Sequence, residues 1–125
     1  MKLFTHNILM CNKKGCTINN YPLKIIATKI INVPHEYNKD SLIRFIQKID
    51  FNGLKSACND LNIQLKCDFE QLTDEQKKSK EFLDYMNNLL YEIIIQDGII
   101  KCNNCGREYQ IENGITNLIL NDDEI

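Results

Sequence analysis

Four of the six cysteines in this chain stand as two close pairs near its opposite ends. Cys11 and Cys16 form the first pair, and Cys102 and Cys105 form a Cys-x-x-Cys pair. Each pair makes a short loop that can direct two sulfurs at one point, and two such loops supply the four thiolates of a tetrahedral structural zinc site. Because 85 residues separate Cys16 from Cys102, a zinc ion bound by all four would join the two ends of the protein.

Two other roles are open for these cysteines. A disulfide framework requires an oxidising compartment, but residues 1–6 lack the long apolar stretch of a secretory signal, and 125 residues can build a core without disulfides. A redox Cys-x-x-Cys is expected at a helix start, where the dipole favours the thiolate, whereas Gly106 and a strand-like stretch follow Cys105. We therefore favour a structural zinc ion. The expected metal ligands are Cys11, Cys16, Cys102 and Cys105.

The composition is typical of a globular protein from a reducing compartment. The chain is 43% hydrophobic and 26% charged, and it has no apolar run of the roughly 18–20 residues that span a bilayer. Cysteines kept as thiolates indicate the cytoplasm or the nucleus. Cys58 and Cys67 are expected to be buried as small apolar side chains.

The net charge of −2 argues against a stand-alone nucleic-acid-binding protein, because the neutralisation of phosphates requires a basic surface. Residues 1–34 nevertheless carry five lysines and no acidic residue. Lys13, Lys14 and Arg107 lie beside a predicted site whose thiolates and zinc ion carry a total charge of about −2. They can offset that charge or contact RNA, and we favour local compensation.

The pattern of strand signals places β-structure at both ends of the chain. Expected strands cover residues 3–10, 23–33, 108–111 and 115–120, and residues 92–95 can already be strand. Pro34 ends the second of these strands. Asp97-Gly98 and Asn113-Gly114 carry the composition of turns.

The middle of the chain has the three-four spacing of helices. A first helix is expected from a cap at Asp40 or Ser41, and Asn52-Gly53 is expected to end it before a second helix at 54–61. Thr73 and Gln76 form a capping-box pattern for a third helix. The apolar stripe of this helix, at Phe82, Met86, Leu89 and Leu90, is expected to be core.

These elements predict an α+β fold, in which a small zinc-ribbon-like β-sheet is built from both termini and a helical domain is inserted between the two zinc loops. The predicted boundaries are 1–34 and 96–125 for the zinc-binding β domain and 35–95 for the helical insert. The last strand has apolar residues on both faces and therefore needs cover on both sides. Either a protein partner or the helical insert provides that cover, and we favour a partner.

The sequence shows no catalytic constellation. His6 and His35 are the only histidines, and neither stands next to a nucleophile with which it forms a plausible pair. There is no Gly-rich phosphate loop. We therefore do not expect an enzyme.

The two ends of the chain resemble one known family. The opening residues Met-Lys-Leu-Phe-Thr-His-Asn-Ile-Leu-Met-Cys and the closing stretch from Cys102 to Leu120, with Cys-x-x-Cys-Gly-Arg-x-Tyr and Asn-Gly-Ile-x-Asn-Leu-x-Leu, are similar to the multifunctional methyltransferase subunit family. This is the small zinc-binding activator subunit shared by eukaryotic tRNA, rRNA and release-factor methyltransferases. Thr116 departs from the proline that members usually carry there. The middle matches only in helical character and at residues 72–75.

The resemblance implies a non-catalytic subunit that activates and stabilises class I methyltransferases. The partner binds S-adenosylmethionine and performs the chemistry, and the two chains form a heterodimer, with one methyltransferase bound at a time. Nucleic acid or release factor is contacted only through the complex, and no membrane is involved. By position in the family, the partner-facing region corresponds to the strand around Cys11 and to Ile115–Leu120, and the expected partner-binding residues are Ile115, Asn117, Leu118, Ile119 and Leu120. The alternative function is a nucleic-acid-binding zinc-ribbon protein, and a thiol redox enzyme is a further rival.

Overall fold

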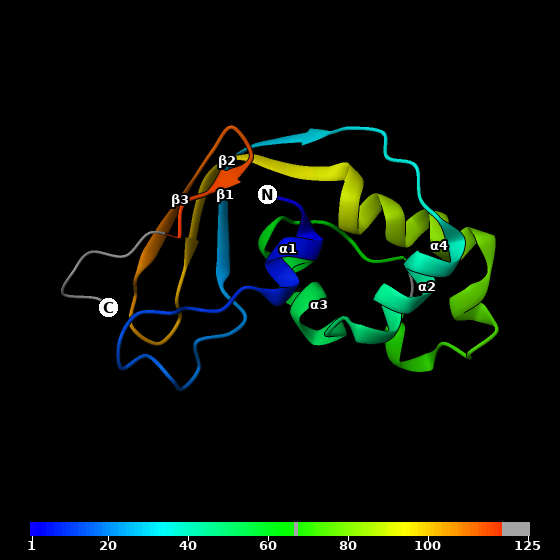
Figure 1. Ribbon diagram of the computed structural model, residues 1–125, viewed down its shortest axis with the longest axis horizontal. Helices are drawn as coiled ribbons and strands as arrows, with labels where there is room; N and C mark the ends of the chain where they lie inside the picture. Colours follow the sequence, from blue (N-terminus) through cyan, green and yellow to red (C-terminus); the bar gives the residue numbers. More distant parts are fainter. Residues whose placement is uncertain (67, 119–125) are drawn as a thin grey trace.

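A computed structural model describes residues 1–66 and 68–118 and confirms the α+β class (Figure 1). The helical elements are α1 (Leu3–Ile8), α2 (Lys39–Lys48), α3 (Phe51–Asp60), η1 (Phe69–Gln71), η2 (Gln76–Lys78), α4 (Lys80–Asn87) and the π-helical turn η3 (Asn88–Glu92). The strands are β1 (Lys24–Asn32), β2 (Ile93–Lys101), β3 (Glu108–Glu112) and β4 (Ile115–Thr116). Within these described residues, no helix combines the length and apolar character that a membrane crossing requires.

One antiparallel sheet, in the order β1-β2-β3-β4, joins the two ends of the chain. Because β1 and β2 are antiparallel, the start of β1 lies beside the end of β2, where Lys24 pairs with Lys101. The loop before β1 and the loop after β2 therefore leave the sheet at the same end. Figure 1 shows these two loops together, far from α2 and α4.

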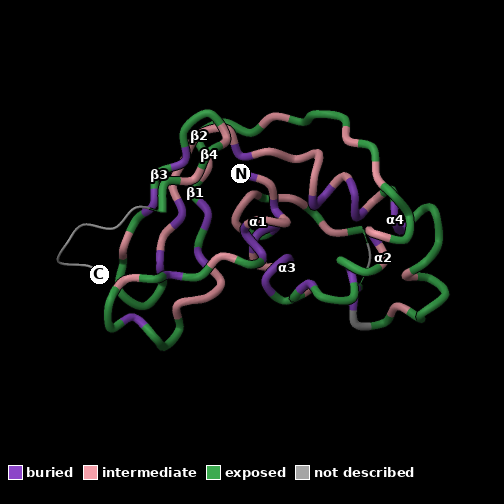
Figure 2. The backbone as a smooth tube through the Cα atoms, in the orientation of Figure 1, coloured by how far each residue is buried: buried purple, intermediate pink, exposed green. Residues whose placement is uncertain are grey.

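The core lies between the sheet and the helices (Figure 2). Ile25, Ile100 and Tyr109, which are neighbours across β1, β2 and β3, are buried on one face of the sheet. Cys58 of α3 is buried as predicted, and Cys67 lies outside the described residues. The predicted stripe of α4 and η3 is core, because all four of its members are buried: Phe82, Met86, Leu89 and Leu90. The division into 1–34 with 96–125 and 35–95 stays a prediction.

The starting points of the helices differ in detail from the prediction. Asn38, rather than Asp40 or Ser41, caps α2, and its side chain accepts a hydrogen bond from the Ser41 backbone. Thr73 and Gln76 do form reciprocal capping-box bonds of 2.9 and 3.2 Å, but these open the short turn η2. Helix α4 starts later, with its own cap at Ser79.

Both Gly-containing signals in the middle of the chain were wrongly assigned to breaks. Asn52-Gly53 lies inside α3, where a Cβ at Gly53 would stand 2.3 Å from the Tyr21 hydroxyl. Asp97-Gly98 lies inside β2 at a register shift against β1. Gly98 has a φ of +154°, and a Cβ there would stand 2.4 Å from the Ile26 carbonyl oxygen. Both glycines allow a close approach of neighbouring chain, which local sequence does not distinguish from a turn.

Residues 3–10 do not form the predicted strand, because residues 3–8 form α1. The residues that pair with the sheet are Met1 and Lys2 instead. Lys2 bridges Ile94, and the Met1 amine donates 2.7 Å hydrogen bonds to the carbonyls of Ile95 and Gly114. The chain then turns into α1, whose buried residues Leu3, His6 and Asn7 follow the helical spacing that the strand interpretation overlooked.

The last predicted strand is shorter in the described part of the chain. Ile115 and Thr116 form β4, whereas Asn117 and Leu118 follow it without strand pairing. Ile119 and Leu120 lie outside the described residues.

His6 is fully buried on α1, and this burial generates a pH dependence. Its Nε2 lies 2.6 Å from the Leu23 carbonyl oxygen, and Nδ1 has no hydrogen-bond partner within residues 1–66 and 68–118. Burial lowers the pKa of His6, while the Leu23 bond and the charge of Asp60 act in the opposite direction. Folded His6 is therefore neutral, and the unfolded chain binds more protons below its ordinary pKa of 6.5.

We predict that the free energy of unfolding falls as the pH is lowered from about 7.5 to about 5.5, and that it falls less in His6→Gln. Glutamine keeps a side-chain donor for the Leu23 carbonyl but has no ring to protonate. Denaturant titrations of both proteins at the two pH values measure the difference, and His35→Gln is the control for the other histidine. Equal pH dependence in the parent and in His6→Gln would contradict this prediction.

Candidate metal centre

The four predicted cysteines meet at one point in the structure. Their sulfurs all lie within 4.8 Å of one another. Cys11 Sγ is 3.6 Å from Cys105 Sγ, and Cys16 Sγ is 3.5 Å from Cys102 Sγ. A tetrahedron with metal–sulfur bonds of about 2.3 Å has sulfurs about 3.8 Å apart, whereas a disulfide has them about 2.05 Å apart. The cluster therefore fits a single metal ion and is compatible with zinc.

The first loop, between α1 and β1, is held in shape by Asn20. The Asn20 side-chain amide donates to the backbone carbonyls of Cys11 and Cys16 at 3.2 and 3.1 Å. The backbone carbonyl of Asn20 accepts a hydrogen bond from the Cys11 N–H at 3.0 Å. Gly15 allows the turn with a φ of +81°. These bonds fix both sulfurs of the first pair relative to each other.

The second loop, between β2 and β3, is closed by its own backbone. Cys102 donates to the Arg107 carbonyl at 2.9 Å, and Gly106 donates to the Cys102 carbonyl at 3.0 Å. Gly106 adopts a φ of +76°, which explains why a glycine follows the Cys-x-x-Cys pair. The strand β3 follows directly, as the strand-like stretch after Gly106 predicted.

The sulfurs perturb one another. Burial of Cys102 acts to raise the pKa of its thiol. Hydrogen bonds from the backbones of Cys105 and Asn104 to the sulfur act in the opposite direction, and the pKa is lowered to about 7. The Asn104 amide favours the Cys16 thiolate, yet burial and the three neighbouring thiols raise the pKa of Cys16 to about 12. A divalent cation among the sulfurs would favour the thiolate at every position. With four sulfur ligands, of which only Cys105 is exposed, the site leaves no open position for water or substrate and has the character of a structural centre.

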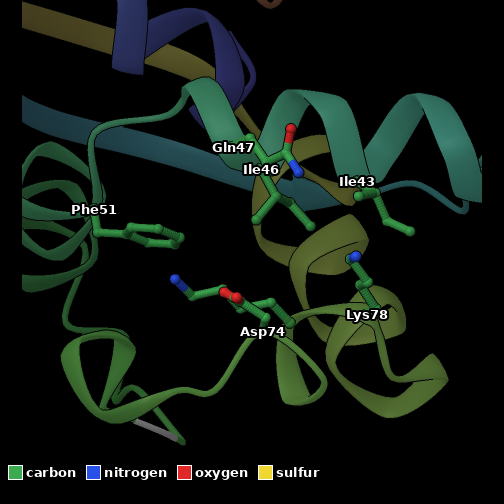
Figure 3. Close-up of a pocket in the computed structure, with 7 residues that line it drawn as sticks. Ile43, Ile46, Gln47, Phe51, Asp74 and Lys78 are labelled. Atoms are coloured by element: carbon green, nitrogen blue, oxygen red, sulfur yellow. The ribbon is translucent and has the colours of Figure 1, made fainter.

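Both histidines make contacts within the fold, away from the cysteine cluster. His6 is a core residue, and His35 Nδ1 lies 2.9 Å from the Asn87 side-chain oxygen while its ring stacks on Tyr91. A hollow of about 310 Å³ beneath α2 has an apolar wall at Ile43, Ile46 and Phe51 (Figure 3). The other lining residues are Gln47, Asp74, Lys77 and Lys78.

Among the residues predicted to bind a partner, Leu118 lines one groove, whereas Ile115 and Asn117 line another hollow. Ile115 is 73% exposed and Leu118 is 37% exposed. The groove that Leu118 lines has a volume of about 610 Å³ and lies between the predicted strand and the N-terminal residues. Its other lining residues are Met1, Lys2, Thr5, Leu9, Ile94, Gln96, Asn113, Gly114 and Thr116. The Asn117 backbone N–H donates to the Gln110 carbonyl at 2.8 Å.

The resemblance also implies that the region around Cys11 faces the partner. Two apolar side chains are exposed there, Ile8 and Met10, and Leu9 between them lines the groove. The strand predicted over residues 3–10 is not what presents them, because Ile8 ends α1 and Met10 follows it.

Comparisons with known proteins agree with the resemblance found in the sequence motifs. The family described as "Trm112p-like protein" matches residues 2–114. The chain is 34% identical over 128 residues to "Multifunctional methyltransferase subunit trm112" of Schizosaccharomyces pombe, with 100% of each chain covered. It is 32% identical over 124 residues to "Multifunctional methyltransferase subunit TRM112-like protein" of Mus musculus, with 99% of this chain and 98% of the relative covered.

A solved structure has a similar fold. It is the E. cuniculi Mtq2-Trm112 complex, described as responsible for the methylation of the eRF1 translation termination factor. The TM-score is 0.58 at 20% sequence identity, with 95% of each chain covered. This likeness supports the α+β fold.

We predict that the purified chain holds one tightly bound metal ion, and that Cys102→Ser loses it. Metal binding to such sites is worth about 10–16 kcal/mol, comparable to the whole stability of a domain of this size. The loops and adjoining strands should therefore loosen in Cys102→Ser, while much of the helical signal in circular dichroism persists. Metal analysis and circular dichroism provide the readouts.

Cys58→Ala is the matched control, because Cys58 is buried in α3 and lies outside the cluster. Its metal content should equal that of the parent. A fall in metal content in Cys58→Ala, or full retention in Cys102→Ser, would show that the ligand set is wrong.

Proposed function

This chain belongs to the Trm112p-like family, and from that premise we propose that it is a non-catalytic subunit that activates and stabilises S-adenosylmethionine-dependent class I methyltransferases. The observation that carries the proposal is the match to named methyltransferase subunits over essentially the whole chain. The partner supplies the cofactor site and the reacting groups. This chain supplies a binding surface that stabilises and orders the methyltransferase.

A partner surface of suitable chemistry lies around the groove. Leu9 and Leu118 line it, Ile8 and Met10 on either side of Leu9 are exposed, and exposed apolar area is typical of protein interfaces. Ile115 is exposed as well and lines a second hollow together with Asn117.

The edge of the sheet supports the same surface. Among the residues that the structure describes, strand β4 is last in the order and pairs with β3 alone, so its other edge can offer backbone groups to an added strand. A partner strand placed there would bring its side chains against Leu118 and the groove. We propose that the methyltransferase binds in this way, which makes the complex a heterodimer.

We propose that the metal ion is zinc and that its role is structural. Four cysteine ligands, three of them buried, are typical of structural zinc sites. The ion would fix the first loop to the second and thereby hold β1, β2 and β3 in register beside the groove.

The substrates follow from the family. The relatives are named multifunctional, and the E. cuniculi complex is described as methylating a translation termination factor. We propose that this subunit serves methyltransferases of tRNA, rRNA and translation release factor, and that it works in the cytoplasm and the nucleus.

Leu118→Asp should release the methyltransferase. Truncation of a central apolar anchor commonly costs about 2 kcal/mol or more, which is about a thirtyfold loss of affinity, and an unpaired charge in a desolvated interface costs more. Co-purification of a tagged chain with the co-expressed methyltransferase measures retention, and the solubility of the methyltransferase should fall with it.

Ile26→Asp is the matched control, because Ile26 is 43% exposed on β1, the opposite edge strand of the sheet. It should retain the partner. Both variants must keep the metal content and circular dichroism of the parent. Full partner retention by a folded Leu118→Asp would place the interface elsewhere on the molecule.

Cofactor binding should require the partner. Calorimetric titration of the isolated chain with S-adenosylmethionine is expected to show no heat of binding, whereas the complex binds the cofactor. A saturable signal from the isolated chain at about micromolar cofactor, in the range of ordinary cofactor affinities, would place a cofactor site on this subunit and contradict the assignment.

A further inference from the structure

The two cysteine loops differ in how their sulfurs obtain hydrogen bonds. In the second loop the donors are local backbone groups. The Asn104 N–H lies 3.4 Å from Cys102 Sγ, and the backbone of Arg107 hydrogen-bonds Cys105. The tight Cys-x-x-Cys-Gly turn therefore supplies donors to its own two sulfurs.

In the first loop, the backbone N–H groups of the two cysteines bond to carbonyl oxygens rather than to a sulfur. The Cys11 N–H donates to the Asn20 carbonyl, and the Cys16 N–H donates to the Lys13 carbonyl. The sulfurs of this loop instead take side-chain donors from the other end of the chain. The Asn104 amide lies 3.3 Å from Cys16 Sγ, and the Tyr109 hydroxyl lies 3.2 Å from Cys11 Sγ.

The sulfurs of Cys11 and Cys16 depend on these two side-chain donors because both cysteines are buried. Cys11 and Cys16 are buried, as is Tyr109, whereas Cys105 is exposed. Water can solvate an exposed thiolate, but a buried one depends on donors from the protein. Four thiolates around a divalent ion carry a total charge of about −2, and each hydrogen bond withdraws part of that charge from a sulfur.

Tyr109 is placed to be a strong donor. Its hydroxyl oxygen lies 3.4 Å from the Asn12 backbone nitrogen, which can donate to it, and the Arg107 guanidinium lies 4.8 Å from the centre of its ring. The Asn12 side-chain oxygen, at 3.1 Å, competes for the single hydroxyl proton. A thiolate is the stronger acceptor because the bond is charge-assisted, and the Asn12 N–H then polarises the hydroxyl in a chain that ends at Cys11.

We propose that Asn104 and Tyr109 are positioning residues of the metal centre, whose side-chain hydrogen bonds to Cys16 and Cys11 set how tightly the N-terminal loop retains the metal. This inference rests on the proposed zinc site. According to this inference, two residues that are not metal ligands determine how strongly the metal ion holds the two ends of the chain together.

The test compares metal affinity and thiolate electronics in Tyr109→Phe and Asn104→Ala. Each substitution removes one donor and keeps all four ligands. Competition with a zinc chelator should show about 10- to 100-fold weaker binding for each variant, as for other outer-shell partners of metal ligands. In the cobalt-substituted proteins, the sulfur-to-cobalt charge-transfer band should move to longer wavelength, because a thiolate without its hydrogen bond holds its electrons less tightly.

Two matched controls separate donor loss from general damage. Tyr91→Phe removes a buried hydroxyl that has no hydrogen-bond partner in the described chain. Asn103→Ala removes the neighbouring amide, which donates to the Pro22 carbonyl rather than to a sulfur. Both should keep the affinity and the spectrum of the parent. Asn104→Asp, which puts a carboxylate oxygen in place of the donor, should weaken zinc binding more than Asn104→Ala does.

Each outcome decides the inference. Weaker binding together with a shifted band in Tyr109→Phe and Asn104→Ala supports it. Parental affinity in both variants overturns it, and so does weaker binding with an unshifted band, which assigns the side chains to packing alone. A parent chain that takes up neither zinc nor cobalt contradicts the metal centre itself, and the inference is then wrong with it.

Discussion

The antiparallel register between β1 and β2 is the constraint on which the rest of the structure depends. It pairs Ile25 with Ile100, both buried, and a slip of β1 by one residue would turn Ile25 to the opposite face of the sheet. Core burial therefore fixes the register. The register in turn places Lys24 beside Lys101, so that the loops carrying the two cysteine pairs leave the sheet at the same end. The position of the metal centre therefore follows from core packing, and Cys11, Cys16 and Cys102 are themselves buried within that core.

The N-terminal residues provide a second link between the sheet and the helices. Met1 and Lys2 occupy the edge of β2 beyond the end of β3. The helix that follows ties itself to the start of α3, because the Asn7 side chain exchanges hydrogen bonds of 2.7 and 2.9 Å with the backbone of Asp50. The metal centre thus lies at one end of β2, and the groove beside Ile94 lies at the other. A metal ion that orders the strands at one end can stabilise a partner surface formed at the other, which suits a subunit whose proposed role is to order another protein.

The errors of the sequence analysis share one physical cause. Residues 3–10 carry the apolar character of a strand, but the edge of β2 is already paired with Met1 and Lys2, and the buried positions of α1 follow helical spacing. Gly53 and Gly98 have the composition of breaks, yet each permits the close approach of a segment distant in sequence, Tyr21 in one case and β1 in the other. In each case a local signal had two structural solutions, and a contact distant in sequence selected between them.

The sequence by itself predicted the four cysteines that the structure brings together, because cysteine spacing is a local property and two short loops with two sulfurs each match one tetrahedral ion. It also determined the α+β class, the buried stripe of α4 and the family, whose motifs stand at both ends of the chain. Only the tertiary structure decided which residues surround the metal centre and the groove. Asn104 and Tyr109 come within hydrogen-bond distance of Cys16 and Cys11, and Leu9 comes beside Leu118, through sheet pairing. Such neighbours lie about ninety residues or more apart in the sequence. They come into contact only when the strands pair in the register that core burial selects, and no local sequence pattern encodes that contact.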